Sequence, residues 1–345
     1  MKARRVLLVI IVGLISLAKG VYGDESLSGP LWSRSIYPHF LIYYHLPGMQ
    51  AKIEPEGHLK IGSAFYCAQG FINYETNGGG AETSYYRLID YENITIENML
   101  SYSPFSSMEL GITLRWIIYY GGFLDMVVQA FHNLWGFPNN NREHFPQNDL
   151  FIDIKNKNNI TLSLEDPVFG FGDIDLWAKI NIWDIDFLVI SALCAVKLPT
   201  GNLATLTGSG YPDFALALLL DWYIFNNFAL YLNIGIIVPY DCLIAETETQ
   251  PFAMFNGLVA IEYGISDWLS LLAQLNVRTS PIEGKIYTSD SIDFFAIPQT
   301  DLLIGTVIKT GNLSIQFYFQ EDPFTHNTTD VTFNLAFIYK VLAQD

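Results

Sequence analysis

Ser209 has the surroundings closest to those of a catalytic nucleophile, because it lies between two glycines in Gly208-Ser209-Gly210. A serine hydrolase needs a histidine base and an orienting group close to its serine. The Gly-x-Ser-x-Gly turn that exposes such a serine in many hydrolases is absent, and Gly, Thr and Pro surround the position. The stretch therefore predicts a turn-forming loop, and a membrane hydrolase is less favoured than a function without catalysis.

Metal and redox chemistry find no support in the spacing of the histidines and cysteines. The six histidines form no His-Glu-x-x-His pair, and Cys67, Cys194 and Cys242 form no Cys-x-x-Cys pair. Three widely spaced cysteines define neither a disulfide scaffold nor a zinc site. We predict no metal, no cofactor and no catalytic residue, and we interpret the cysteines as small packing residues.

The more informative polar residues lie on segments in which polar and apolar residues alternate. From Ile174 to Ile182, apolar residues occupy every second position, and Asp175 and Lys179 lie on the opposite face. The same alternation recurs in 109–118, 269–278, 313–320 and 331–340. A period of two residues is typical of β-strands with one apolar face.

A soluble β-sandwich would also alternate, but two features favour a transmembrane β-barrel. The segments are about as long as the roughly 9 to 11 residues that a tilted membrane strand needs, whereas strands of globular proteins average about five or six. The polar face is often small or amide-bearing, as at Asn233, Gly235 and Asn256, and carries few charges. Such a face fits the interior of a closed barrel, whose backbone groups must be satisfied within the sheet.

The alternation predicts an all-β, antiparallel barrel of about fourteen strands, with a range of about 12 to 16. The expected strands are 37–45, 58–69, 84–102, 108–120, 148–164, 172–182, 186–198, 213–224, 228–239, 252–264, 268–278, 301–309, 312–320 and 331–341. An alternative interpretation of 148–164 is a small hairpin that turns at 156–159. We expect 24–345 to form a single barrel domain.

Loop lengths predict the orientation, because periplasmic turns are short and external loops are long. Counting back from a periplasmic C-terminus places 321–330, 279–300, 240–251 and 199–212 outside. Continuing the count places 121–147 on the periplasmic side or in the lumen. Within it, 123–135 predicts a short amphipathic helix that ends at Gly136, and we favour a cap over the barrel mouth above a plug or a gate.

The N-terminus predicts export. Residues 1–23 open with Lys2, Arg4 and Arg5 and continue into an apolar run too short to cross a bilayer comfortably, which is the layout of a cleaved signal peptide. The chain carries a formal net charge of −17, which becomes more negative when this basic segment is removed. So acidic a protein repels nucleic acid, and we exclude nucleic-acid binding.

Several stretches, taken in their order, resemble a family of uncharacterised bacterial outer-membrane β-barrel proteins, a domain of unknown function. They are 29–34 (GPLWSR), 122–148, 170–173 (GFGD), 197–201 (KLPTG) and 208–213 (GSGYPD). The resemblance covers most of the mature chain and implies a barrel in the outer membrane, without an established activity. One departure is that outer-membrane strands usually end on a terminal aromatic residue, whereas this chain continues past Tyr339.

Polar side chains inside a barrel can set ion preference, or they can pair across the lumen and block it. The residues predicted to face the lumen are Arg115, Asp175, Lys179, Glu262, Gln274, Arg278, Lys309 and Lys340. The leading hypothesis is a passive channel or transporter for small solutes in the bacterial outer membrane, with membrane lipid and small solutes as its partners. The alternative is a non-conducting structural or surface-interaction barrel, and the sequence does not choose between them.

Overall fold

The computed structural model describes residues 27–77, 83–136, 139, 141–155, 161–240, 253–280, 298–321 and 328–341. The expected signal peptide, 1–23, lies outside the described residues.

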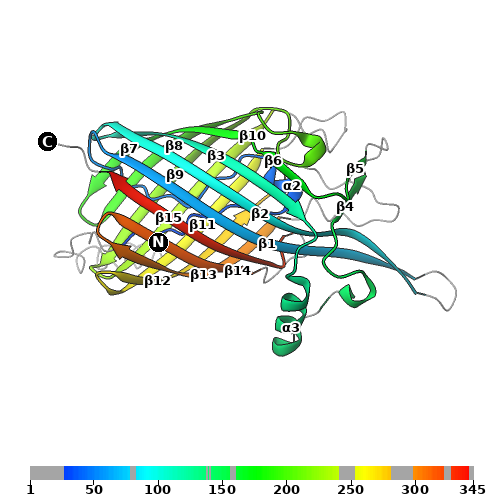
Figure 1. Cartoon of the computed structure of the whole chain (residues 1–345). Coiled ribbons are helices and arrows are strands. Elements are labelled where there is room, and N and C mark those ends of the chain that lie inside the picture. Colours follow the sequence, from blue (N-terminus) through cyan, green and yellow to red (C-terminus); the bar gives the residue numbers. More distant parts are fainter. Residues whose placement is uncertain are drawn as a thin grey trace, which may run out of the picture.

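Within these residues, twelve antiparallel strands close into a barrel (Figure 1), in agreement with the predicted architecture. The wall runs in the order β1, β2, β3, then β7 to β15, and β15 pairs with β1 from Leu59↔Val341 to Gln69↔Val331. The wall strands are β1 (Leu59–Asn77), β2 (Thr83–Phe105), β3 (Met108–Tyr120), β7 (Ile174–Ile185), β8 (Leu188–Leu198), β9 (Asp213–Phe225), β10 (Phe228–Pro239), β11 (Met254–Ser266), β12 (Leu269–Arg278), β13 (Gln299–Thr310), β14 (Leu313–Glu321) and β15 (Val331–Val341).

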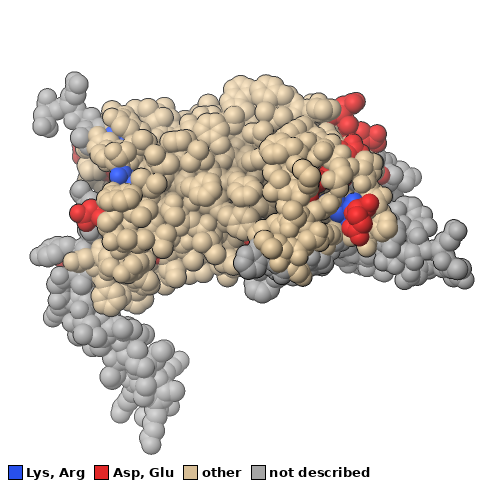
Figure 2. Space-filling view, turned by 60° about the horizontal axis from the view of Figure 1, so that its bottom comes forward, with Lys and Arg blue, Asp and Glu red and all other residues tan. Residues whose placement is uncertain are grey.

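The predicted alternation separates the two faces of the wall. In β9, Ala215 and Leu219 point inward and are buried, while Leu216 and Leu218 are 70% and 55% exposed. Figure 2 shows that the face it presents has a broad band free of charged residues, with the charges gathered at the two ends. A wall that is apolar outside and polar inside is what a membrane barrel requires.

The two ends of the barrel differ. One end carries the tight connections after β2, β7, β9, β11 and β13, and we call it the short-turn end. The other end, the long-loop end, carries the longer connections and the extension of β1 and β2 beyond the other strands (Figure 1). In the described part of the chain, no helix is long and apolar enough to span a membrane.

Residues 37–45 were predicted to form a wall strand, and this prediction was wrong. They contain the short helix α2 (Pro38–Leu41) and lie inside the barrel, with every residue buried. An apolar run is expected both for a lipid-facing strand and for a chain enclosed on all sides, so composition alone did not separate the two cases.

The described residues of 148–164 also lie outside the wall, and two strands among them pair as in the hairpin of the alternative interpretation, whose predicted turn at 156–159 lies outside the described residues. β4 (Phe151–Lys155) pairs with β5 (Thr161–Leu164) and, over two residues, with the extended part of β2. Nearby, β6 (Val168–Phe171) pairs with β3 beyond the stretch where β3 meets β7. Without 37–45 and 148–164, the predicted strand list matches the twelve wall strands.

Counting 148–164 as a wall strand placed 121–147 at the wrong end. This connection leaves β3 at the long-loop end, where the Tyr119 hydroxyl donates to the Leu206 carbonyl in the loop that contains the 3-10 turn η2 (Leu203–Thr205). The predicted helix is present as α3 (Asp125–Trp135), followed by a 3-10 turn, η1 (Arg142–His144). α3 does not cap the mouth, because it packs on the outer surface of the barrel against Phe319 and Phe333.

Close packing inside the wall gives a first prediction. The Trp177 ring covers Gly111 on the neighbouring strand, and a Cβ at 111 would lie 2.1 Å from that ring. We expect Gly111→Ala to lower the free energy of unfolding by about 1–3 kcal/mol, because the ring must move. Gly264→Ala is the control, since its Cβ would meet no atom closer than 3.4 Å. Guanidinium unfolding in lipid vesicles measures both, and equal losses would contradict the packing argument.

Candidate functional site in the barrel lumen

Residues 27–53, which we call the lumenal segment, run through the barrel from one end to the other and back. Ser28 and Gly29 lie near the short-turn end, where their amides donate to the Glu262 carboxylate (3.1 and 2.7 Å). α2 lies at the long-loop end (Figure 1), and the amide of Lys52 is again near the short-turn end, on Asp221. Every residue from 29 to 48 is buried. The lumen is thus filled by the chain's own N-terminal region.

The two arms of the lumenal segment touch each other. The Gln50 side-chain amide donates to the Leu27 carbonyl at 3.4 Å. A Cβ on Gly48 would lie 2.0 Å from the carbonyl oxygen of Leu31, so the close approach of the two arms requires glycine at 48.

Strand side chains supply the hydrogen bonds that the irregular backbone of the segment lacks. The amide donors and their acceptors are Leu31 to Gln274 (2.9 Å), Trp32 to Gln316 (2.8 Å), Tyr44 to Asp213 (2.7 Å), Leu46 to Asn256 (3.2 Å) and Met49 to Asn233 (3.1 Å). The Trp32 carbonyl in turn accepts from the hydroxyls of Tyr66 and Tyr318. A buried backbone group without a partner costs about 1–3 kcal/mol, so these wall side chains hold the segment in place.

Arg34 adds a charged anchor to these contacts. Its guanidinium lies 2.5 Å from Glu97 on β2 and 2.8 Å from Asp175 on β7. Arg115 reaches the same Asp175 at 3.1 Å and donates to the Asp173 carbonyl at 2.7 Å. All these side chains are buried, and an ion left alone there would be costly. The cluster therefore ties the lumenal segment to two wall strands.

A second charged group lies near the short-turn end, where the segment leaves the lumen. Lys60 and Lys179 each lie 2.8 Å from Glu109, and Lys340 lies 2.9 Å from Glu54. Burial alone would raise the pKa of the Glu54 carboxyl, but Lys60 and Lys340 outweigh it and hold this pKa below its usual value. The pairing therefore stabilises the fold at neutral pH, and this contribution is lost as the pH falls through the lowered pKa.

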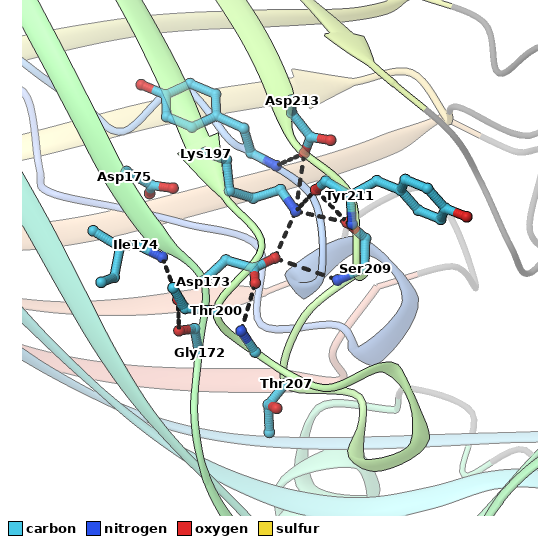
Figure 3. A network of polar contacts seen from close by, with 12 residues as sticks. Gly172, Asp173, Ile174, Asp175, Lys197, Thr200, Thr207, Ser209, Tyr211 and Asp213 are labelled. Atoms are coloured by element: carbon cyan, nitrogen blue, oxygen red, sulfur yellow. Dashed lines mark hydrogen bonds and ion pairs between the residues drawn. The ribbon is translucent and has the colours of Figure 1, made fainter.

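A third group, near the long-loop end, centres on Lys197 (Figure 3). Its ammonium lies 2.5 Å from Asp173 and 3.5 Å from Asp213, and it donates to the Ser209 hydroxyl (2.7 Å) and the Tyr211 carbonyl (3.0 Å). Because Asp213 also accepts the Tyr44 amide, this network joins the 199–212 loop to the lumenal segment.

The network accounts for Ser209 and its flanking glycines as part of a structural loop rather than as the site of a catalytic nucleophile. Ser209 is buried, and its hydroxyl is engaged with Lys197 and with the Tyr211 carbonyl. Lys197 Nζ lies between two carboxylates and donates a hydrogen bond to the serine hydroxyl, so it is placed as a donor to Ser209 rather than as its general base. The arrangement holds a loop in place, as the turn-forming interpretation predicted.

The structure places the eight predicted lumen residues as follows. Arg115, Asp175, Lys179, Glu262, Gln274 and Arg278 are buried, and Lys309 and Lys340 are half-exposed near the short-turn end. Arg278 pairs with Asp301 on β13. The backbone of the lumenal segment is hydrogen-bonded to Glu262, Gln274 and Lys179. In this structure these three side chains therefore bind the protein's own backbone.

Sequence reasoning missed Arg34, Glu97, Lys197 and Asp213. The last three lie on predicted strands, and Glu97 shares the inward face of β2 with Thr95, so the alternation contained a signal for it. Arg34 precedes every wall strand, and no periodic signal places it in the lumen.

Among the described residues, cavities lie between the lumenal segment and the wall, and two of them adjoin each other. One, of about 70 Å³, is lined by Glu54, Lys60 and Lys340 near the short-turn end. The other, of about 10 Å³, is lined by Arg34 and Asp175 and has room for about one water molecule. Five residues line both cavities and separate them: Trp32, Pro47, Met49, Met99 and Trp177.

Comparison with known proteins agrees with this architecture. The model of the family described as "Protein of unknown function (DUF3187)" matches residues 72–341, which span the wall from the last part of β1 to β15 but not the lumenal segment. No curated protein matches the chain.

Among solved structures, the chain is similar to an outer membrane channel from Pseudomonas putida F1. The TM-score is 0.51 at 14% identity, covering 84% of this chain and 98% of that one. At this identity the likeness shows a shared fold. The chain is also matched to the NanC porin with a TM-score of 0.43 at 7% identity, covering 82% of this chain and 100% of that one. No argument is based on a TM-score this low.

The Lys197 network gives a second prediction. Lys197→Met leaves Asp173 and Asp213 buried without their cation, so we expect the free energy of unfolding to fall by about 3–5 kcal/mol. Lys309→Met, at a half-exposed lysine, is the control and should change it by less than about 1 kcal/mol. Denaturant unfolding in vesicles compares the two, and similar values for both variants would count against the network as a structural anchor.

Proposed function

The chain belongs to the family of proteins of unknown function DUF3187, and we propose that it is an outer-membrane channel for small solutes that the lumenal segment holds closed. The channel fold and the polar lumen support this proposal. The short-turn end then faces the periplasm, and the lumenal segment enters from that side.

The observation that carries the proposal is the pair of cavities, which share lining residues from β2 and β7. They form an interrupted path from the cluster of Lys60 and Lys340 to the cluster of Arg34 and Asp175. The side chains that lie between the two cavities include Trp32 from the lumenal segment and Trp177 from the wall. A movement of the lumenal segment would join the cavities.

The way in which the segment is held is consistent with such movement. Its contacts with the wall include hydrogen bonds between backbone groups and polar side chains, beside the packing of buried apolar residues such as Leu31, Ile36 and Phe40. Each contributes about 0.5–1.5 kcal/mol net, because water can replace the lost partner when the lumen hydrates. Water can therefore replace these hydrogen-bond partners when the segment moves, while the buried apolar residues of the segment oppose its departure.

The wall charges predict the ion preference of the opened lumen. The buried, inward-facing acids of the described strands are Glu97, Glu109, Asp175, Asp213, Asp221, Glu262 and Asp301, and the corresponding bases are Arg115, Lys179, Lys197 and Arg278. The excess of carboxylates favours cations, and departure of the segment would remove Arg34 from the balance.

A non-conducting structural barrel is the second candidate. The observation in its favour is that the lumenal segment fills the lumen and leaves two separate cavities rather than a continuous one. The two functions differ in one measurable property, which is whether removal of the obstruction produces current.

We predict that Trp32→Ala raises the mean conductance of the refolded protein in a planar bilayer several-fold, because the indole separates the two cavities. Trp268→Ala is the control, since this tryptophan is 56% exposed at the turn between β11 and β12 and should leave conductance unchanged. Heat-modifiable migration in gels verifies that both variants fold.

Deletion of residues 27–52 extends the test to selectivity. We expect stable open steps and a reversal potential in a salt gradient that indicates cation preference, from the excess of wall carboxylates. If the deletion variant and Trp32→Ala both fold and insert but neither conducts, the channel proposal is wrong and the structural barrel is favoured.

A further inference from the structure

The exposed face of α3 is apolar, the opposite of what water favours on a surface helix. Met126, Val127 and Leu134 are 71%, 49% and 77% exposed, and Ala130 is exposed between them. Their spacing places them along one stripe of the helix, and Phe123, just before it, is 60% exposed. Asn133 is the polar residue described on this face.

The opposite side of α3 packs against the outside of the wall. Leu124 and Val128 are buried in a cluster with Cys67, Phe319 and Phe333. The Phe131 ring lies 6.0 Å from that of Phe319. Phe319 is on the same face of β14 as Phe317, which is 51% exposed in the lipid-facing band. The helix therefore lies beside residues that already face lipid.

Buried polar contacts fix the start of the helix at the long-loop rim. The Glu92 carboxylate accepts the amides of Phe123 (2.6 Å) and Leu124, and a Cβ on Gly122 would collide with this carboxylate. Asp125 accepts from the Gln69 side chain at 3.1 Å. The orientation that leaves the apolar stripe outward is thus determined by specific contacts rather than by chance exposure.

We propose that α3 is a membrane-interface helix whose exposed stripe contacts the acyl chains of the lipid leaflet at the long-loop end. The helix lies beside the apolar band of the barrel wall, because its buried face packs on Phe319 and Phe333 of that wall, and its stripe adds further exposed apolar side chains there. Amphipathic helices of this kind rest at the boundary between headgroups and acyl chains. This inference depends on the barrel crossing a membrane, and it is independent of whether the lumen conducts.

Site-directed spin labelling of the full chain tests the proposal. Single cysteines at Met126→Cys and Leu134→Cys, in a background with the native cysteines replaced, are labelled and refolded into phosphatidylcholine vesicles. Phe317→Cys on the lipid-facing wall and Glu143→Cys, exposed in the same connection as α3, give the lipid and water references.

We expect the labels at 126 and 134 to collide with oxygen more than with a water-soluble nickel complex, as the label at 317 does. A ratio like that of the label at 143 would overturn the proposal, because the stripe would then face water. Labels shielded from both quenchers would also overturn it, and would indicate that a second copy of the chain covers the stripe. The two positions are independent, so failure of one variant to fold leaves the other as the test.

Discussion

The irregular backbone of the lumenal segment can lie inside a membrane barrel only if its amides and carbonyls find partners there. Strands satisfy their own backbone through the closed sheet, but a chain that runs along the lumen has no neighbouring strand to pair with. The wall provides the partners through side chains, as at Gln274, Gln316 and Asp213. The amide and carboxylate side chains on the inner face meet this requirement.

The same requirement links structure to the proposed function. Side chains that satisfy a peptide backbone can equally be satisfied by water or a polar solute, so a wall built to bind the lumenal segment is also a wall suited to a hydrated lumen. The acids that pair with Arg34 in the closed barrel, Glu97 and Asp175, become part of the lining when the segment moves.

The wall could be predicted from the sequence because its signal is local. Alternation at every second residue, as in 174–182, is imposed by lipid on one side and polar groups on the other, and it is present in each strand separately. The prediction of a wall strand at 37–45 failed because a chain enclosed by the barrel is apolar without being a strand. Whether a segment is enclosed depends on the whole barrel and not on its local sequence. Because 148–164 was predicted to be a wall strand, 121–147 was then assigned to the wrong end of the barrel. The helix at 123–135 was predicted nearly to its bounds, but not its position outside the wall, since its apolar face fits a cap or a lipid surface equally well.

The most direct test of the account is amide hydrogen exchange of the membrane-inserted protein, followed residue by residue or in short peptides over 28–52. If wall side chains bind the backbone of the lumenal segment, the amides of Leu31, Trp32 and Tyr44 should exchange slowly, far more slowly than those of exposed loop residues such as Asp166. Exchange of these amides as fast as that of the loop would show that the segment does not occupy the lumen, and would contradict the central claim.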